Sequence, residues 1–252
     1  MVPLSDSSAS SNEDGFLDMK SDKYAPPRLL YGLFWIGLSI YAFNFAPGAG
    51  AEAAARDADL AIKMITTPFD GDVSKSIFAG IFNSLGVLPA IYASLLLPGS
   101  KDQRVPALPF VLGSFAFGFF SVGPYLALRN KNFDVTNATR GRGSGAFESK
   151  ISAILLLTFS CWLFFYSLTT GDLGAACQGY QDLFWSQRIV HVSTLDALLL
   201  SAIVVDPMSE DMTRRNYTNI PAWVFALLPI IGPSVYLLLR PPLPLDKVEK
   251  QK

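Results

Sequence analysis

The sequence predicts an all-α protein, a polytopic bundle of about six transmembrane helices. Half of its 252 residues are hydrophobic, the mean hydropathy is +0.33, and 16% are charged, whereas a soluble domain carries ~25% charged residues. Apolar runs close to the ~20 residues that cross a bilayer core recur along the chain. Two of them, 76–97 and 106–128, contain no Lys, Arg, Asp or Glu.

The N-terminal part combines a polar tail with the first apolar run. Residues 1–28 are rich in Ser and acids and predict a disordered tail, whereas a transit peptide would be Arg-rich and poor in acids. The run 29–46 is diluted by Gly32, Gly37 and Asn44. Basic residues before it and small residues after it resemble a signal peptide with its cleavage site. Because the run is longer than the apolar region of a typical signal peptide, we predict a retained span, with cleavage as the alternative.

The runs 76–97 and 106–128 are separated only by a short, charged loop that contains Pro and Gly. In lipid, each backbone polar group must be satisfied within its own segment, which leaves helices as the spanning form. The pair therefore predicts a transmembrane helical hairpin.

The remaining segments predict three more spans, so that the transmembrane domain covers 29–242. The fifth span ends at Asp206-Pro207, a good N-cap and first-turn pair for a further turn of helix. In chain order these segments are a surface helix over 52–62, a polar loop over 129–150, spans over 151–169, 189–205 and 221–239, a loop with interfacial aromatic residues over 171–187, and a charged tail over 243–252.

Charge and repeats give little further guidance. Six alternating spans place ten Lys and Arg residues on each side, so the positive-inside rule assigns no orientation. No repeat of solenoid period is visible, and inverted repeats of the transporter kind are not evident, although three plus three spans is arithmetically possible. The net charge of −1 excludes nucleic acid as a partner. Cys161 and Cys177 are predicted to be free thiols, because they lie too far apart for an easy disulfide.

Asp196 is the most unusual residue of the fifth run. An ionisable side chain at this depth is expensive and marks a functional or packing-critical position. It follows Ser193 by one turn, and the Ser193 hydroxyl is within reach of a hydrogen bond to it. Two interpretations stay open: a proton or cation relay, or a carboxyl group that locks neighbouring helices together.

His191 and Asn83 are candidate pigment ligands. His191 is the only histidine, and a neutral imidazole can coordinate a tetrapyrrole metal. Asn83 lies inside the second apolar run, where it either ligates a pigment or substrate or forms an interhelical hydrogen bond. His191 and Asp196 are roughly 140° apart around one helix, so they do not form a pair on one face. The alternative for His191 is an interfacial side chain bonded to a neighbouring helix.

The motifs of conventional catalysis are missing from the sequence. We find no Ser/His/Asp triad, HExxH motif, nucleophile elbow or pair of carboxylates at glycosidase spacing. A lone histidine without Cys or His partners cannot build a zinc site. The charged cluster around Glu210, Asp211, Arg214 and Arg215 predicts a solvated loop face, with docking of a partner as the alternative.

Two stretches resemble a known group of proteins. The first covers 78–92 and 95–98 and continues to 124–129, and the second runs from Thr194 to Asp206. Together they resemble multi-pass membrane proteins of unassigned function from cyanobacteria and plastids, over about a third of the chain. The resemblance implies residence in the thylakoid or plastid-envelope membrane.

Three functions are compatible with these observations. The leading hypothesis is an accessory or assembly subunit of a photosynthetic complex that acts by helix packing and holds chlorophyll or carotenoid at His191 or Asn83. Its partners would be the lipid bilayer and the subunits of a photosystem or another thylakoid complex. The alternative is a small proton-coupled transporter with Asp196 as its relay. The third is a membrane-embedded enzyme of lipid or isoprenoid metabolism, which needs a carboxylate or metal cluster.

Overall fold

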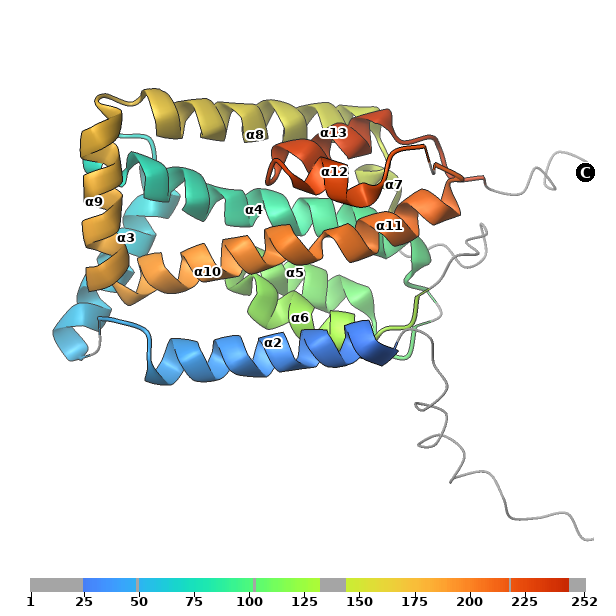
Figure 1. Cartoon of the computed structure of the whole chain (residues 1–252), viewed down its shortest axis with the longest axis horizontal. Helices are drawn as coiled ribbons and strands as arrows, with labels where there is room; N and C mark the ends of the chain where they lie inside the picture. Colours follow the sequence, from blue (N-terminus) through green and yellow to red (C-terminus); the bar gives the residue numbers. More distant parts are fainter. Residues whose placement is uncertain (1–24, 49, 102, 132–143, 218, 245–252) are drawn as a thin grey trace, which may run out of the picture.

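The computed structural model describes residues 25–48, 50–101, 103–131, 144–217 and 219–244, and the regular structure within them is entirely helical. The predicted all-α class is confirmed. Residues 1–24 of the predicted N-terminal tail and 245–252 of the predicted C-terminal tail lie outside the described residues. The long helices run along the long axis of the molecule, and other helices lie across one of its ends (Figure 1).

The first half begins with α2 (Ala25–Asn44), which starts inside the segment predicted as a tail. It is followed by α3 (Ala51–Thr66), which confirms the short surface helix and extends it. The Asp72 side chain accepts a hydrogen bond from the Ser74 N–H and caps the short helix η2 (Val73–Lys75). That helix leads directly into α4 (Ser76–Leu96) and the terminal turn η3 (Leu97–Gly99).

Helix α4 is the centre of the core. It packs against α5, α8 and α10, and the side chains of Phe78, Leu88, Ile91 and Tyr92 are fully buried. The Tyr92 hydroxyl donates a hydrogen bond of 2.8 Å to the Leu200 carbonyl of α10. A buried hydroxyl needs such a partner, and this bond ties the two central helices together.

The third apolar run is two helices rather than one. Helix α5 (Ala107–Phe117) ends at Gly118, and α6 (Phe119–Leu128) starts immediately after it. The two helices pack against each other, and the Ser121 hydroxyl of α6 donates to the Phe110 carbonyl of α5. At 1.5 Å per residue each is roughly 15 Å long, about half of the ~30 Å hydrocarbon core. Neither helix is long enough to cross that core alone, and the predicted transmembrane hairpin with α4 is not confirmed.

The second half begins with α7 (Ser144–Phe147) and α8 (Lys150–Thr169). The segment predicted as an aromatic loop is helix α9 (Leu173–Ser186), capped by Asp172. Helix α10 (Arg188–Ile203) continues almost without a break into α11 (Val205–Arg214). A further helix follows the fifth run, as predicted, but its N-cap is Val204; Asp206 lies inside α11 and pairs with Lys131.

The last apolar run is also split. Helix α12 (Ala222–Ala226) and helix α13 (Ile231–Leu239) are joined by a turn and pack against each other. A side chain at Gly232 would overlap the Phe225 carbonyl, so glycine permits the close approach of the two helices. Like α5–α6, this run turns back on itself, and the prediction of six spans is not confirmed.

The order of elements in the first half recurs in the second. Each half consists, in chain order, of a long helix (α2 or α8), a helix across its end (α3 or α9), a second long helix (α4 or α10–α11) and a helical hairpin (α5–α6 or α12–α13). The corresponding helices of the two halves run in the same direction (Figure 1). The two halves thus form a parallel repeat, in which both run in the same direction, rather than an inverted repeat.

Details of the two hairpins support the repeat. Each starts after an N-cap proline, Pro106 or Pro221. Each turns at a residue with positive φ, which is Gly118 at 51° or Ile230 at 55°. Each return helix contains a Gly-Pro pair and ends at a C-cap arginine.

Matching hydrogen bonds hold the first long helix of each half to its hairpin. At the start of α2, Arg28 donates to the Ala127 carbonyl at the end of α6. At the start of α8, Lys150 donates to the Arg240 carbonyl just after α13. Both cations satisfy carbonyl groups that a helix leaves unpaired at its C-terminus.

These contacts define two ends of the molecule. One end of the molecule, which we call the arginine end, holds the starts of α2 and α8, the ends of α4 and α11, and the outer ends of both hairpins (Figure 1). At this end Arg214 of α11 donates a hydrogen bond of 2.9 Å to the Leu95 carbonyl of α4. At the other end, the α9 end, Asp57 of α3 accepts a hydrogen bond from the Ile189 N–H at the start of α10. Burial raises the pKa of the Asp57 carboxyl.

By length and composition, three helical segments of the described chain can cross a membrane, Val73–Gly99, Lys150–Thr169 and Arg188–Arg214. Two-thirds of the apolar window of the first is buried inside the protein, compared with 17% for the second. The central segment is therefore α4, and α8 offers most of its apolar surface to the surroundings.

Candidate functional site

The break between α5 and α6 is built on glycine. Gly118 has φ 51° and ψ −127°, a conformation that L-residues with a Cβ avoid. A Cβ at this position would overlap the carboxylate of Asp196. Glycine therefore serves the turn and the approach of an acidic side chain at once.

Asp196 lies on α10 with its carboxylate against the start of α6. Its side chain is buried, and Oδ1 accepts a hydrogen bond of 2.8 Å from the Phe119 N–H. The first N–H groups of a helix lack partners within the helix, and the helix dipole favours negative charge there. Asp196 thus caps a helix from another element, and Phe119 is its hydrogen-bond partner, in place of the Ser193 hydroxyl that the sequence suggested.

A cavity of about 550 Å³ opens beside this carboxylate. Asp196, Ser193 and Asn83 all line it, together with Ser114 and Gly118 from the first hairpin. The Asn83 amide nitrogen donates to the Ala79 carbonyl at 2.8 Å, a bond that does not engage the amide oxygen. Three of the four residues singled out from the sequence therefore meet at one cavity, which we call the Asp196 cavity.

His191 does not line this cavity. Its Nε2 lies 2.9 Å from the Tyr41 hydroxyl, and its Nδ1 lies 3.1 Å from the Phe184 carbonyl. The ring is buried and packs against Phe184 and Trp185. To ligate a metal, His191 would have to give up one of these hydrogen bonds, which join α10 to α2 and α9.

The charged cluster on α11 is buried, so the prediction of a solvated loop face was wrong. Glu210, Asp211, Arg214 and Arg215 are each at most 5% exposed. Arg129, which follows α6, lies 2.6 Å from Glu210. The helix carries these side chains one turn apart, and i,i+4 spacing brings opposite charges together.

Asp211 is the hub of this cluster. Its Oδ2 accepts hydrogen bonds from Tyr236, Arg240 and Arg215 at 2.8 to 2.9 Å. Arg240 also donates to the Ser94 carbonyl of α4. Burial lowers the pKa of Arg240, and the neighbouring Asp211 charge opposes that effect. Because Arg129 and Arg240 end the two hairpins, the cluster clamps both hairpins to α11.

Neither a disulfide nor a metal site is found within the described part of the chain. Cys161 and Cys177 are free thiols, as predicted. No group of three or more His, Cys, Asp or Glu side chains among the described residues is placed to hold a metal ion. The Asp196 cavity is therefore the candidate site, with the charged cluster as its support.

No family model, curated protein or solved structure matches this chain. The resemblance to membrane proteins of cyanobacteria and plastids stays a prediction. The features that bear on function are therefore the geometry of the Asp196 cavity and the parallel repeat.

Proposed function

We propose that this protein crosses the membrane four times, through α2, α4, α8 and α10–α11, and is a small proton-coupled transporter whose relay residue is Asp196. The observation that carries this proposal is the Asp196 carboxylate, buried on a candidate span and bonded to the first N–H of a half-length helix beside a cavity. Ionisable side chains inside membrane segments mark ion or substrate pathways by default.

The architecture favours transport over simple packing. Transporters are commonly built from internal repeats, including parallel ones, and bind their cargo where half-length helices end near the membrane midplane. Here the turn of the first hairpin supplies such an end, and Asn83 and Ser193 supply polar groups on the facing helices. The cargo would be a small polar solute, since the cavity falls within the ~300–1,000 Å³ range of small-molecule sites.

The coupling step follows from the Phe119–Asp196 bond. An ionised carboxylate at a helix N-terminus is held by both the hydrogen bond and the helix dipole. Protonation removes the charge and weakens that attachment. The turn at Gly118 is then free to move away from α10 and change access to the cavity. Proton binding and access are thereby linked through one two-state element.

The distribution of basic residues gives an orientation once the hairpins no longer count as spans. The positive-inside rule places the more basic end on the untranslocated side, which is the arginine end. Of the described Lys and Arg residues, Arg28, Lys101, Arg104, Arg129, Lys131, Lys150, Arg214, Arg215 and Arg240 belong to that end, and Arg56, Lys63, Lys75 and Arg188 to the other.

Asp196→Asn tests the relay directly. A cysteine at Ser114, in a chain with Cys161 and Cys177 changed to serine, reports access to the cavity through labelling with a water-soluble maleimide. We expect the labelling rate in liposomes to differ at least fivefold between acidic and alkaline buffer, and Asp196→Asn to abolish that difference. The same variant should abolish solute-driven proton uptake in liposomes loaded with a pH dye, across a panel of amino acids, carboxylates, sugars and cations.

Asp182→Asn is the matched control, because Asp182 is an exposed carboxylate outside the cavity. It should leave both the labelling and the proton uptake unchanged. A folded Asp196→Asn protein with normal pH-dependent labelling and normal proton uptake would remove Asp196 as the relay.

An accessory role in a photosynthetic complex, in a thylakoid or envelope membrane, is the second candidate. The exposed face of α8 favours it, since Phe159, Trp162, Phe164 and Phe165 are each at least 39% exposed and would meet lipid or a partner helix. If His191 or Asn83 holds chlorophyll or carotenoid, protein purified in mild detergent should absorb visible light and co-migrate with other subunits. His191→Phe or Asn83→Ala should then remove the absorbance. A colourless monomer would contradict this candidate.

An enzyme of lipid or isoprenoid metabolism is the third candidate. It requires a cluster of carboxylates or metal ligands facing a cavity. Asp196 is the only carboxylate that lines the Asp196 cavity in the described part of the chain. No particular observation favours this function.

A further inference from the structure

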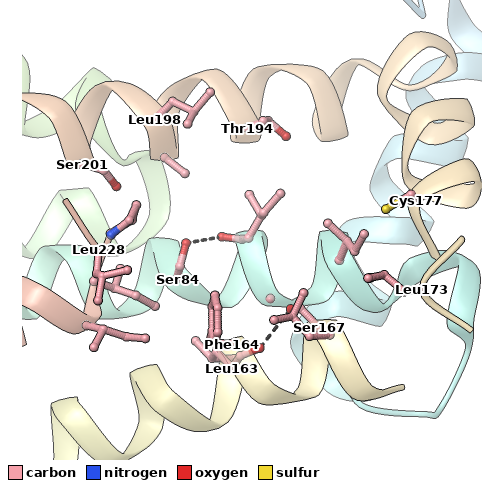
Figure 2. Close-up of a pocket in the computed structure, with 18 residues that line it drawn as sticks. Ser84, Leu163, Phe164, Ser167, Leu173, Cys177, Thr194, Leu198, Ser201 and Leu228 are labelled. Atoms are coloured by element: carbon pink, nitrogen blue, oxygen red, sulfur yellow. Dashed lines mark hydrogen bonds between the residues drawn. The ribbon is translucent and has the colours of Figure 1, made fainter. Parts of the chain in front are cut away.

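A second cavity, of about 500 Å³, lies among the three segments that are long and apolar enough to cross a membrane (Figure 2). Gly80 and Ser84 of α4, Leu163 and Ser167 of α8, and Ser201 of α10 line it. Different stripes of α4 and α10 face the Asp196 cavity. The two cavities are therefore separate sites that lie on different faces of the same two helices, α4 and α10.

Three of the hydroxyl groups that line this second cavity, those of Ser84, Ser167 and Thr194, bond back to carbonyl groups of their own helices. Ser84 donates to the Ile81 carbonyl at 2.6 Å, and Ser167 donates to the Leu163 carbonyl at 2.9 Å (Figure 2). Thr194 donates to the Val190 carbonyl in the same way. No charged side chain lines this cavity within the described chain. Its walls therefore favour a hydrocarbon ligand.

The rim of the cavity consists of apolar side chains that are exposed. Leu198 is 59% exposed, Leu228 is 56% exposed, and Phe164 is 48% exposed. If α8 and α10 cross a membrane, these side chains face lipid tails. A ligand would then enter sideways from the hydrocarbon core and not from water.

One end of the cavity is closed by a strained turn. Ile230 has φ 55° and ψ −44°, and the Ile231 N–H donates to the Pro229 carbonyl at 2.6 Å, which closes a tight turn. A β-branched residue at positive φ is an outlier, and such strain gathers at ligand clamps and switch regions. The equivalent residue of the first hairpin is glycine. The strain is thus peculiar to the hairpin that closes this cavity.

The cavity has a direction. Leu173 and Cys177 of α9 lie at one end of it, and Leu228 of the second hairpin lies at the other (Figure 2). The lining stripe of α10 from Thr194 to Ser201 is roughly 10 Å long, about a third of the ~30 Å hydrocarbon core. A chain inserted here would start near the membrane surface at the α9 end and reach the Ile230 turn inside the membrane.

We propose that this cavity holds the hydrocarbon chain of a membrane lipid from the leaflet at the α9 end, with the chain directed toward Ile230. The proposal rests on the membrane crossing proposed above but not on transport through Asp196. The lipid would fill the space between the two halves of the repeat and hold the second hairpin in its strained conformation.

Photo-crosslinking tests the proposal. The full chain is reconstituted in phosphatidylcholine vesicles that contain a trace of phosphatidylcholine with a diazirine in its acyl chain. After irradiation, labelled peptides are mapped by mass spectrometry. We expect label on the cavity stripes of α8 and α10 to exceed that on the exposed face of α2 at least fivefold.

Ser201→Phe fills the cavity and should reduce that label at least fivefold. Ala202→Phe, at an exposed neighbour that does not line the cavity, is the matched control and should leave the label unchanged. If Ser201→Phe fails to fold, attachment of a bulky maleimide to Cys177, in a chain with Cys161→Ser, blocks the cavity from its α9 end and should have the same effect.

Equal labelling of all lipid-exposed faces, unchanged by Ser201→Phe or by modification of Cys177, would overturn the proposal. Asp196→Asn should leave the lipid label at its normal level. Loss of transport and loss of the lipid site are thereby distinguishable.

Discussion

Gly118→Ala is expected to unfold the first hairpin locally and to abolish function. Alanine at φ 51° costs ~1–3 kcal/mol in backbone strain, and its Cβ would overlap the Asp196 carboxylate. The carboxylate must then leave the Phe119 N–H, so a buried charge loses its partner at a further cost of ~1–3 kcal/mol. Thermal unfolding in detergent should shift to clearly lower temperature, and pH-dependent access to the Asp196 cavity should disappear.

Gly86→Ala provides the control for this substitution. Gly86 lines the same cavity, but a Cβ there meets nothing within 4 Å. Because it lies inside α4, alanine should be neutral or stabilise the helix by ~0.5–1 kcal/mol. If Gly118→Ala were as stable and as active as Gly86→Ala, neither the positive φ at Gly118 nor the contact with Asp196 would constrain the turn.

Asp211→Leu is expected to cause the largest loss of stability in the molecule, ~3–5 kcal/mol. Its carboxylate is fully buried and bonds Arg215, Arg240 and Tyr236. Removing one partner of a buried ion pair leaves the other charge uncompensated, which costs far more than the pair contributes. The free energy of unfolding in detergent, measured with a denaturant series, tests this expectation.

Two further variants show whether charge is the cause. Asp211→Leu combined with Arg240→Met removes both partners of one pair and should recover part of the loss. Asp182→Asn removes an exposed carboxylate that bonds Gln178 one turn away and should change the free energy of unfolding by less than ~0.5 kcal/mol. A double variant no more stable than Asp211→Leu would point to packing, and not charge, as the cause.

The sequence predicts the helical class and singles out Asp196, because an acid inside a long apolar run is conspicuous. It does not reveal the two helical hairpins, since an apolar run of 23 residues is long enough to cross a bilayer. The difference depends on Gly118, one glycine among several in these runs, whose positive φ is a property of the folded chain. Asn83 and Ser193 meet Asp196 because α4 and α10 are neighbours, which no local pattern states.

The burial of the charged cluster on α11 could not be predicted from the sequence for a different reason. Polar residues after an apolar run normally indicate solvent, and the Asp206-Pro207 pair suggested that the helix ends there. In the structure the helix continues to Arg214, and arginines that follow the two hairpins supply partners from distant positions. The spacing of Glu210 and Arg214 was a local signal for a helix. The distant partners Arg129 and Arg240 carried no such signal.

The repeat was present in the sequence as a pattern of scattered residues. Pro-Ala pairs precede both hairpins, and Gly-Pro pairs followed by an arginine end both. The two hairpins differ in length, so the pattern has no fixed period. Apolar residues also replace one another freely in such helices, which leaves little identity between the halves.

In the proposed four-span topology, the two hairpins have a consequence for how the protein is made. A hairpin that enters and leaves by the same face carries no loop across the membrane. During synthesis only two connections need to be translocated, the one between α2 and α4 and the one between α8 and α10. Each of these contains one α-helix, α3 or α9, with few basic residues. The insertion machinery would therefore handle two similar units in succession, each complete before the next begins.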